Sequence, residues 1–167
     1  MLTHNREHYL KLAIDSVLNQ TYKNFCLIIL DNCSIDNTKA MVEQITDERV
    51  IYIYRESHND FLNIHFAFQE CITKFLIVLH DDDVLEPTYL DEILNVICNS
   101  DYSAVSVASR YIDENGIRIA GGTESYHDEI FSGTDYIKRF YSRNPLWMVY
   151  PSVIYRKEFY FDYKKFI

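Results

Sequence analysis

Four short apolar runs, separated by segments with helical periodicity, constrain the fold of this chain more than any other feature. Each run is continuously apolar rather than alternating, which is typical of strands that are covered on both faces of a sheet. The runs are residues 25–30 (FCLIIL), 50–54 (VIYIY), 75–79 (FLIVL) and 104–108 (AVSVA). The pattern therefore predicts a mostly parallel sheet with helices packed on its faces.

Three segments between these runs have the pattern of amphipathic helices. In residues 7–20, apolar side chains recur at intervals of three and four residues and form one stripe. Residues 37–45 can begin from Asn37 or Asp36 as a cap, and residues 87–97 open with Pro87, which suits a first helical turn. Strands and helices thus alternate, which predicts one α/β domain of the doubly wound type over residues 1–167.

The pattern is weaker after Ala108. Residues 110–122 predict an extended hairpin around Asn115-Gly116, and residues 133–142 predict a short helix capped at Thr134 or Asp135. Residues 144–160 are aromatic, contain two prolines and favour an irregular strand under a cleft.

Composition excludes several classes of protein. The net charge of -9, from 25 acidic and 16 basic residues, argues against a nucleic-acid-binding face. The apolar runs are far shorter than the roughly 20 residues of a transmembrane helix, and no basic-then-apolar leader follows Met1. We therefore expect a cytoplasmic chain, with peripheral association at the inner face of a membrane left open. The four cysteines show no CxxC pairing and are expected to be reduced thiols rather than disulfides or zinc ligands.

Polar loops directly follow two of the apolar runs. Residues 31–38 (DNCSIDNT) follow the run at 25–30, and residues 80–83 (HDDD) follow the run at 75–79. Ligands of open α/β sheets bind beyond the carboxyl ends of the strands, where the loops diverge. We therefore expect both acidic loops at one ligand-binding edge of the sheet.

The three consecutive aspartates Asp81, Asp82 and Asp83 need an explanation. Two carboxylates about 4 Å apart repel by roughly 4 kcal/mol at an effective dielectric near 20, and they raise one another's pKa. Mg²⁺ or Mn²⁺ would reverse that cost and could hold a diphosphate. The alternative is a solvated turn that caps the next helix, with Asp82 or Asp83 at the positive end of its dipole.

Several stretches together resemble glycosyltransferase family 2, the inverting nucleotide-sugar transferases of the GT-A fold. The resemblance covers residues 1–110 well and residues 111–160 loosely. It implies a nucleotide-sugar-binding half at residues 1–110 and the start of an acceptor-binding half at residues 111–167. In the segment around residues 50–59, Asn59 matches the family, and in the metal-motif segment Pro87 does. The matching residues of the opening segment are Thr3, Asn5, Arg6, Ser16, Val17, Leu18, Gln20, Thr21, Tyr22, Asp31, Ser34, Asp36 and Thr38.

The resemblance implies a site for the nucleotide. Thr3, Asn5 and Arg6 would lie beside the base and ribose, and Asp31 and Asn32 would meet the edge of the base. The alternative for this loop is purely structural, with Asp31 or Ser34 bonding to free backbone N–H groups of the next helix.

The resemblance also implies a metal motif, whose usual first acidic position is His80 in this chain. Asp82 is then expected to bind the metal directly, Asp81 to point toward the ribose or the metal's waters, and Asp83 to support the ligands or cap the helix. His80 would contact the diphosphate or simply pack at the end of the strand.

Finally, the resemblance implies a chain that lacks parts of the family's fold. The first, central strand is expected to be missing, because only Met1 and Leu2 precede Thr3. Residues 151–156 resemble a later strand of the family, but the acidic segment that supplies the general base would lie beyond Ile167, so no catalytic residue is assigned.

The expected activity is transfer of a sugar from a nucleotide sugar, with a UDP-sugar favoured, to a glycan or lipid-linked acceptor in polysaccharide synthesis. One alternative is a non-catalytic nucleotide-binding or interaction module of the same fold. Another is a phospho-acceptor signalling domain. That fold has an acidic pair after its first strand, whereas the three aspartates of this chain follow a later strand.

Overall fold

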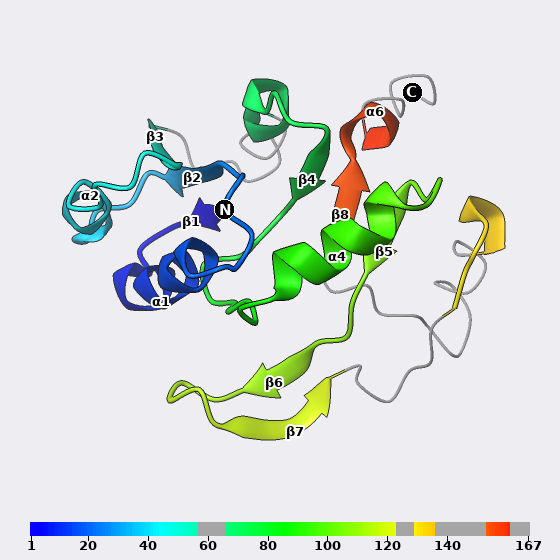
Figure 1. Cartoon of the computed structure of the whole chain (residues 1–167). Coiled ribbons are helices and arrows are strands. Elements are labelled where there is room, and N and C mark those ends of the chain that lie inside the picture. Colours follow the sequence, from blue (N-terminus) through cyan, green and yellow to red (C-terminus); the bar gives the residue numbers. More distant parts are fainter. Residues whose placement is uncertain (57–65, 123–128, 136–152, 161–167) are drawn as a thin grey trace.

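A computed structural model describes residues 1–56, 66–122, 129–135 and 153–160 (Figure 1). Of the helix predicted at residues 133–142, only residues 133–135 lie in these ranges, and those three are helical. Asn59 and the prolines at 145 and 151 lie outside the described residues.

Two three-stranded sheets form the body of the domain. The first has the order β1-β2-β3, with β1 at Leu2–Thr3, β2 at Leu27–Asn32 and β3 at Val50–Arg55, and all its strands are parallel. The second has the order β4-β8-β5, with β4 at Phe75–Ile77, β8 at Val153–Arg156 and β5 at Ala104–Ser106, paired antiparallel. A parallel bridge between Leu2 and His80 joins β1 to the segment after β4.

The predicted α/β fold class is confirmed, but two of its details differ. Within the described residues, the β1–β3 sheet and the Leu2–His80 bridge are parallel, and β4 and β5 run in the same direction as each other. Strand β8, however, lies between β4 and β5 and pairs antiparallel with both. The first strand, expected to be missing, is present over Leu2 and Thr3, and it lies between β2 and the His80 segment.

Two long helices cover the sheets. Helix α1 (Glu7–Leu18) buries Leu10, Ala13, Ile14 and Val17, as its apolar stripe predicts. Helix α4 (Tyr89–Cys98) packs Ile93 and Ile97 against Ile154 of β8. The remaining helices are short: α2 is Thr38–Val42 and α6 is Lys157–Tyr160, and residues 66–70 are also helical.

A buried glutamine ties the end of α1 to the start of α4. Gln20 has no exposed surface. Its Nε2 donates to the carbonyl of Glu86 at 2.7 Å, and its Oε1 accepts from the N–H of Leu90 at 3.0 Å. The loop that follows His80 is therefore fixed at its far end, which limits the positions that the three aspartates can take.

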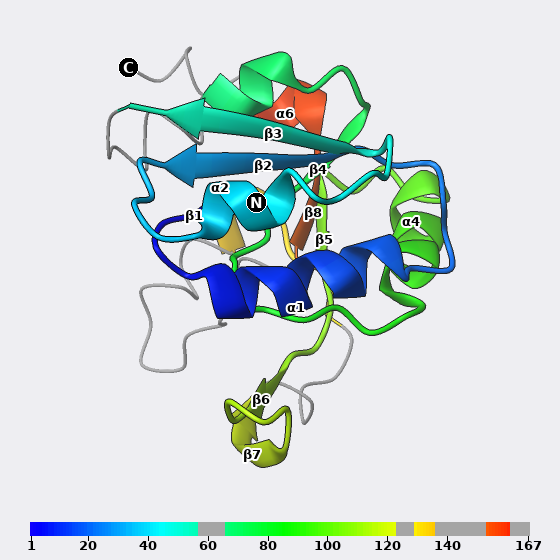
Figure 2. The same cartoon turned by 90° about the vertical axis from the view of Figure 1, so that its left-hand side faces the viewer.

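The predicted hairpin is confirmed as β6 (Arg110–Ile112) and β7 (Arg118–Gly122). Its turn is held by Asp113, whose Oδ1 accepts from the N–H groups of Asn115 at 2.9 Å and Ile117 at 2.8 Å. Gly116 has φ 77°, a left-handed conformation that glycine adopts without strain. The hairpin extends away from the body of the domain (Figure 2).

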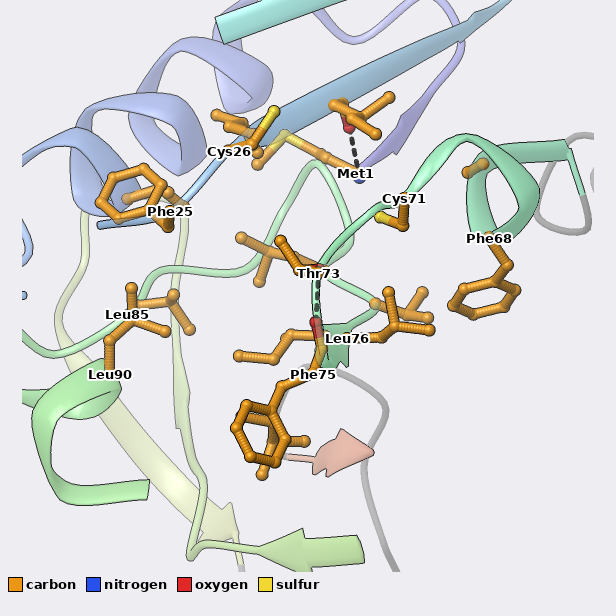
Figure 3. A pocket seen from close by; sticks show the side chains of 18 of the residues that line it. Met1, Phe25, Cys26, Phe68, Cys71, Thr73, Phe75, Leu76, Leu85 and Leu90 are labelled. Carbon is orange, nitrogen blue, oxygen red and sulfur yellow. Dashed lines mark hydrogen bonds between the residues drawn. The ribbon is translucent and has the colours of Figure 1, made fainter. Parts of the chain in front are cut away.

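An apolar cavity of about 410 Å³ lies between β2 and β4 (Figure 3). Its walls include Phe25, Cys26, Phe75, Leu76 and Leu90. The residues of the two acidic loops do not line it, so it is not a candidate site for a polar nucleotide. None of the four cysteines forms a disulfide bond in the structure. Among the described residues, no helix is both long and apolar enough to cross a membrane.

Candidate functional site

Three loops meet at the carboxyl edge of the first sheet. The register of β1 places Thr3 beside Asp31 and Leu2 beside His80. The β1–α1 loop therefore lies between the two acidic loops, residues 31–38 and residues 80–83. The structure thus brings the two predicted loops to one edge.

The carboxylates of the loop at 31–38 accept hydrogen bonds from nearby groups of the fold. Asp31 is fully buried, its Oδ2 accepts from the hydroxyl of Tyr52 at 2.5 Å, and its Oδ1 accepts from the N–H of Ser34 at 2.8 Å. Asp36 accepts from the N–H of Thr38 at 3.0 Å and from that of Glu7 at 3.3 Å, at the starts of α2 and α1. These two aspartates therefore shape the loop.

The pKa values in this loop follow from these contacts. Burial and then the hydrogen bond to Asp31 raise the pKa of Tyr52 well above its ordinary value, so its hydroxyl stays protonated and donates. Burial acts to raise the pKa of Asp36, but hydrogen bonds from Thr38 and Glu7 outweigh it and hold the pKa below its ordinary value. Both residues thus stay in the protonation states that their hydrogen bonds need.

Asn5 locks the β1–α1 loop onto the loop at 31–38. Its N–H donates to Ser34 Oγ at 2.9 Å, and its Oδ1 accepts from the N–H of Ile35 at 2.8 Å. Asn5 has φ 53°, in the left-handed region that asparagine tolerates better than most residues. The contact fixes the backbone just before Arg6, which precedes the first turn of α1.

The loop at 80–83 has a different arrangement. Ligand atoms of His80, Asp82 and Asp83 all lie within 4.8 Å of one another, and His80 Nδ1 is 3.9 Å from Asp83 Oδ2. Asp81, also predicted as part of the metal site, lies outside this group, and its side chain is only 9% exposed. Arg6 Nη1 is 2.5 Å from Asp82 Oδ2 and 3.5 Å from Asp81 Oδ1.

Charge is concentrated in this second loop. Burial raises the pKa of Asp83; His80 acts to lower it, and the neighbouring charges of Asp82 and Asp81 add to the rise. Hydrogen bonds and charge attraction from both aspartates raise the pKa of Arg6. The ionised form of Asp83 is therefore disfavoured, which is the electrostatic setting that a bound cation would relieve.

Three of the predicted nucleotide-site residues are buried beneath this edge. Thr3 is 2% exposed and Asn32 is 2% exposed, while Asp31 has no exposed surface. Thr3 Oγ1 is buried and has no hydrogen-bond partner within the described ranges. Asn5 and Arg6 are exposed. Of the predicted set, Asn5, Arg6 and Asp82 are exposed and the side chain of Asp83 is 35% exposed, so a ligand can reach these four directly.

A family model described as "Glycosyl transferase family 2" matches residues 1–161. The chain belongs to glycosyltransferase family 2. The O-antigen biosynthesis glycosyltransferase WbnJ of Escherichia coli is 31% identical over 120 residues, which cover 70% of this chain and 47% of WbnJ. The chain thus spans about half the length of that relative.

Two solved structures share the fold of this family 2 chain. S. aureus TarS 1-349 in complex with UDP-GlcNAc superposes with a TM-score of 0.75 at 18% identity, covering 98% of this chain and 46% of TarS. The mannosyltransferase PcManGT from Pyrobaculum calidifontis, in complex with GDP-Man and Mn²⁺, superposes with a TM-score of 0.58 at 16% identity, covering 63% of this chain and 33% of PcManGT. The described residues therefore form part of a GT-A fold.

The donor set of this family 2 chain fits a divalent cation. Two carboxylates and one imidazole converge in His80, Asp82 and Asp83. Carboxylate oxygens suit both Mg²⁺ and Mn²⁺. The burial that raises the pKa of Asp83 also favours binding a cation over carrying an uncompensated charge.

Sequence reasoning left three contacts of the site unidentified. It did not group His80 with Asp82 and Asp83, although its place directly before three aspartates was a usable signal. The hydroxyl of Tyr52 could not be placed on Asp31 without the register of β2 and β3. No sequence pattern paired Arg6 with Asp82, because the two residues are 76 positions apart.

Proposed function

We propose that this chain carries the donor-binding part of a glycosyltransferase that moves a sugar from a nucleoside diphosphate sugar to an acceptor hydroxyl. A UDP-sugar is the favoured donor, and the acceptor is a glycan or a lipid-linked glycan in cell-surface polysaccharide synthesis. The observation that carries the proposal is the convergence of His80, Asp82 and Asp83 beside Arg6 at the ligand-binding edge. Support comes from WbnJ, named for O-antigen biosynthesis, and from TarS, solved with UDP-GlcNAc.

Asp82, Asp83 and His80 hold Mn²⁺ or Mg²⁺ in this proposal. When bound, the ion supplies a positive charge that neutralises the leaving diphosphate. PcManGT, which shares the fold, was solved with Mn²⁺. Asp81 contributes through its contact with Arg6 rather than as a ligand, because it lies outside the converging group.

The nucleoside binds against the loop at 31–38 in this proposal. Asp31 is fully buried and both its oxygens already accept hydrogen bonds, so it fixes the shape of the loop from below. Thr3 and Asn32, also buried, support the same surface, and Asn5 faces the ligand. Among these four residues of the predicted nucleotide site, Asn5 would contact the nucleoside and the three buried residues would support the surface beneath it.

Transfer also needs a general base that deprotonates the acceptor hydroxyl. We assign none among the described residues. Residues 1–110 supply the donor-binding half of the domain, and residues 111–167 begin the acceptor-binding half.

Calorimetric titration with UDP, with and without Mn²⁺, tests the proposal. We expect binding that requires Mn²⁺ and an affinity at least about tenfold lower for Asp82→Ala, because a metal ligand is lost. Asp15→Ala is the matched control, since Asp15 is an exposed residue of α1 paired with Lys11. Equal heats for wild type and Asp82→Ala would contradict the metal assignment. No UDP binding at any Mn²⁺ concentration would instead identify a non-catalytic interaction module.

A further inference from the structure

The guanidinium of Arg6 occupies the place where the metal-binding and nucleotide-binding parts of the site meet. Its Nη1 lies 2.5 Å from Asp82 Oδ2 and 3.5 Å from Asp81 Oδ1. We propose that Arg6 is a positioning residue that exchanges partners: it binds the Asp81–Asp82 pair in the free protein and moves to the diphosphate when the donor and the divalent ion bind. This inference rests on the proposed function and adds a coupling between its two ligands.

The guanidinium and a divalent ion compete for Asp82. Arg6 Nη1 is 2.5 Å from Asp82 Oδ2, so a divalent ion held by that oxygen would lie beside a like charge. An ion on the other oxygen would still face a like charge within a few ångströms. The positive charge of Arg6 at Asp82 therefore weakens binding of the ion when no donor is present.

The backbone of Arg6 is fixed, whereas its side chain can move. The interlock of Asn5 with Ser34 and Ile35 holds the preceding residue, and the carbonyl of Arg6 accepts from the N–H of Leu10 at 3.0 Å. The side chain of Arg6 is 50% exposed. The guanidinium can therefore leave Asp82 by rotation about side-chain bonds, without unfolding any element.

A nucleoside diphosphate gives the displaced guanidinium a better partner. The planar guanidinium presents paired N–H donors that match phosphate oxygens, and hydrogen bonds between charged groups are stronger than neutral ones. The donor thus removes Arg6 from Asp82 and brings phosphate oxygens to the ion. The metal and the donor are then expected to bind cooperatively, each raising the affinity for the other by the same factor.

Two titrations of Arg6→Gln test the exchange, with opposite expected signs. Mn²⁺ alone, followed by the electron paramagnetic resonance signal of free Mn²⁺, should bind about two- to fivefold more tightly to the variant, because a competing ion pair is gone. UDP at saturating Mn²⁺, followed by calorimetry, should bind about tenfold more weakly, because a charged hydrogen-bond donor to the diphosphate is gone. A merely structural role would weaken both.

Lys11→Gln is the control, because it removes one positive charge from the exposed face of α1, where Lys11 pairs with Asp15. It should leave both affinities within about twofold of wild type. Arg6→Lys keeps the charge without the planar fork and should fall between wild type and Arg6→Gln in both titrations. Unchanged or weaker binding of Mn²⁺ alone to Arg6→Gln would overturn the exchange while leaving the proposed function intact. Wild type that binds no UDP with Mn²⁺ would overturn both.

Discussion

The two acidic loops at the carboxyl edge of the first sheet differ in the groups that contact their carboxylates. In the loop at 31–38, Asp31 and Asp36 accept hydrogen bonds from backbone N–H groups and from Tyr52. In the loop at 80–83, within the part of the chain that the structure describes, neither Asp82 nor Asp83 accepts a backbone N–H. Their partners are Arg6 and His80.

This difference separates carboxylates that shape the site from carboxylates that, in the proposed function, bind a ligand. A carboxylate that is hydrogen-bonded within the fold stabilises it, whereas clustered carboxylates with few donors cost stability until a cation arrives. The first loop should therefore be sensitive to mutation in its stability, and the second in its ligand binding.

The largest expected effect is on Asp31. Asp31→Ala should lower the free energy of unfolding by about 3 kcal/mol, because the Tyr52 hydroxyl and the Ser34 N–H lose their acceptor in a buried site. Urea denaturation measures it. The matched change Asp82→Ala in the other loop should cost less than about 0.5 kcal/mol, as expected for an exposed ion pair. Similar losses of stability for the two variants would contradict the proposed difference between the two loops.

A smaller loss of folding stability is expected for a substitution of Asp36. Asp36→Ala should cost about 1 kcal/mol at pH 7, the usual value of a helix-start hydrogen bond. The folded-state pKa of Asp36 lies below its ordinary value, so this contribution is present above the ordinary pKa and is lost as pH falls through the folded one. Denaturation of wild type and Asp36→Ala from pH 7 to pH 2 should show that the difference in their free energies of unfolding vanishes. A difference that persists at pH 2 would point to packing instead.

The smallest change in stability is expected at Asp83, where a substitution should stabilise the protein rather than destabilise it. Burial and neighbouring charges raise the pKa of Asp83, so its ionised form is less favourable in the folded chain than in the unfolded one. After allowance for solvent screening, Asp83→Asn should stabilise the metal-free protein by about 0.5 kcal/mol at pH 7. The gain should fade as pH falls through the folded pKa toward the ordinary value. Thermal denaturation in a metal chelator checks the sign, and destabilisation at pH 7 would show that the ionised carboxylate is favoured.

Much of the fold could be predicted from the sequence because the local spacing of apolar residues reflects which faces of each strand or helix are buried. The runs of apolar residues identified β2, β3, β4 and β5, and the helical patterns between them identified α1 and α4. The position of β8 between β4 and β5 could not be predicted, since β8 lies far along the chain and its antiparallel pairing has no local signal. The presence of β1 was underestimated because two residues carry no readable period.

The candidate site could be placed on its loops but not resolved into roles. Strand ends located both acidic loops, since parallel strands present their carboxyl ends at one edge. The separate functions of Asp31 and Asp82 depend on which donors reach each carboxylate. Those donors, Tyr52 and Arg6, come from other elements and are brought there by the register of β1, β2 and β3.

The most direct test of the account is Mn²⁺ binding in the presence of UDP, measured by electron paramagnetic resonance for one variant of each loop. Asp82→Asn should lose at least about tenfold in Mn²⁺ affinity, because a metal ligand becomes a neutral amide. Asp36→Asn should stay within about twofold of wild type, because its carboxylate bonds to backbone N–H groups of its own loop and of α1. Equal affinities for the two variants, whether both fall or neither does, would contradict the division of the site into a structural loop and a ligand-binding loop.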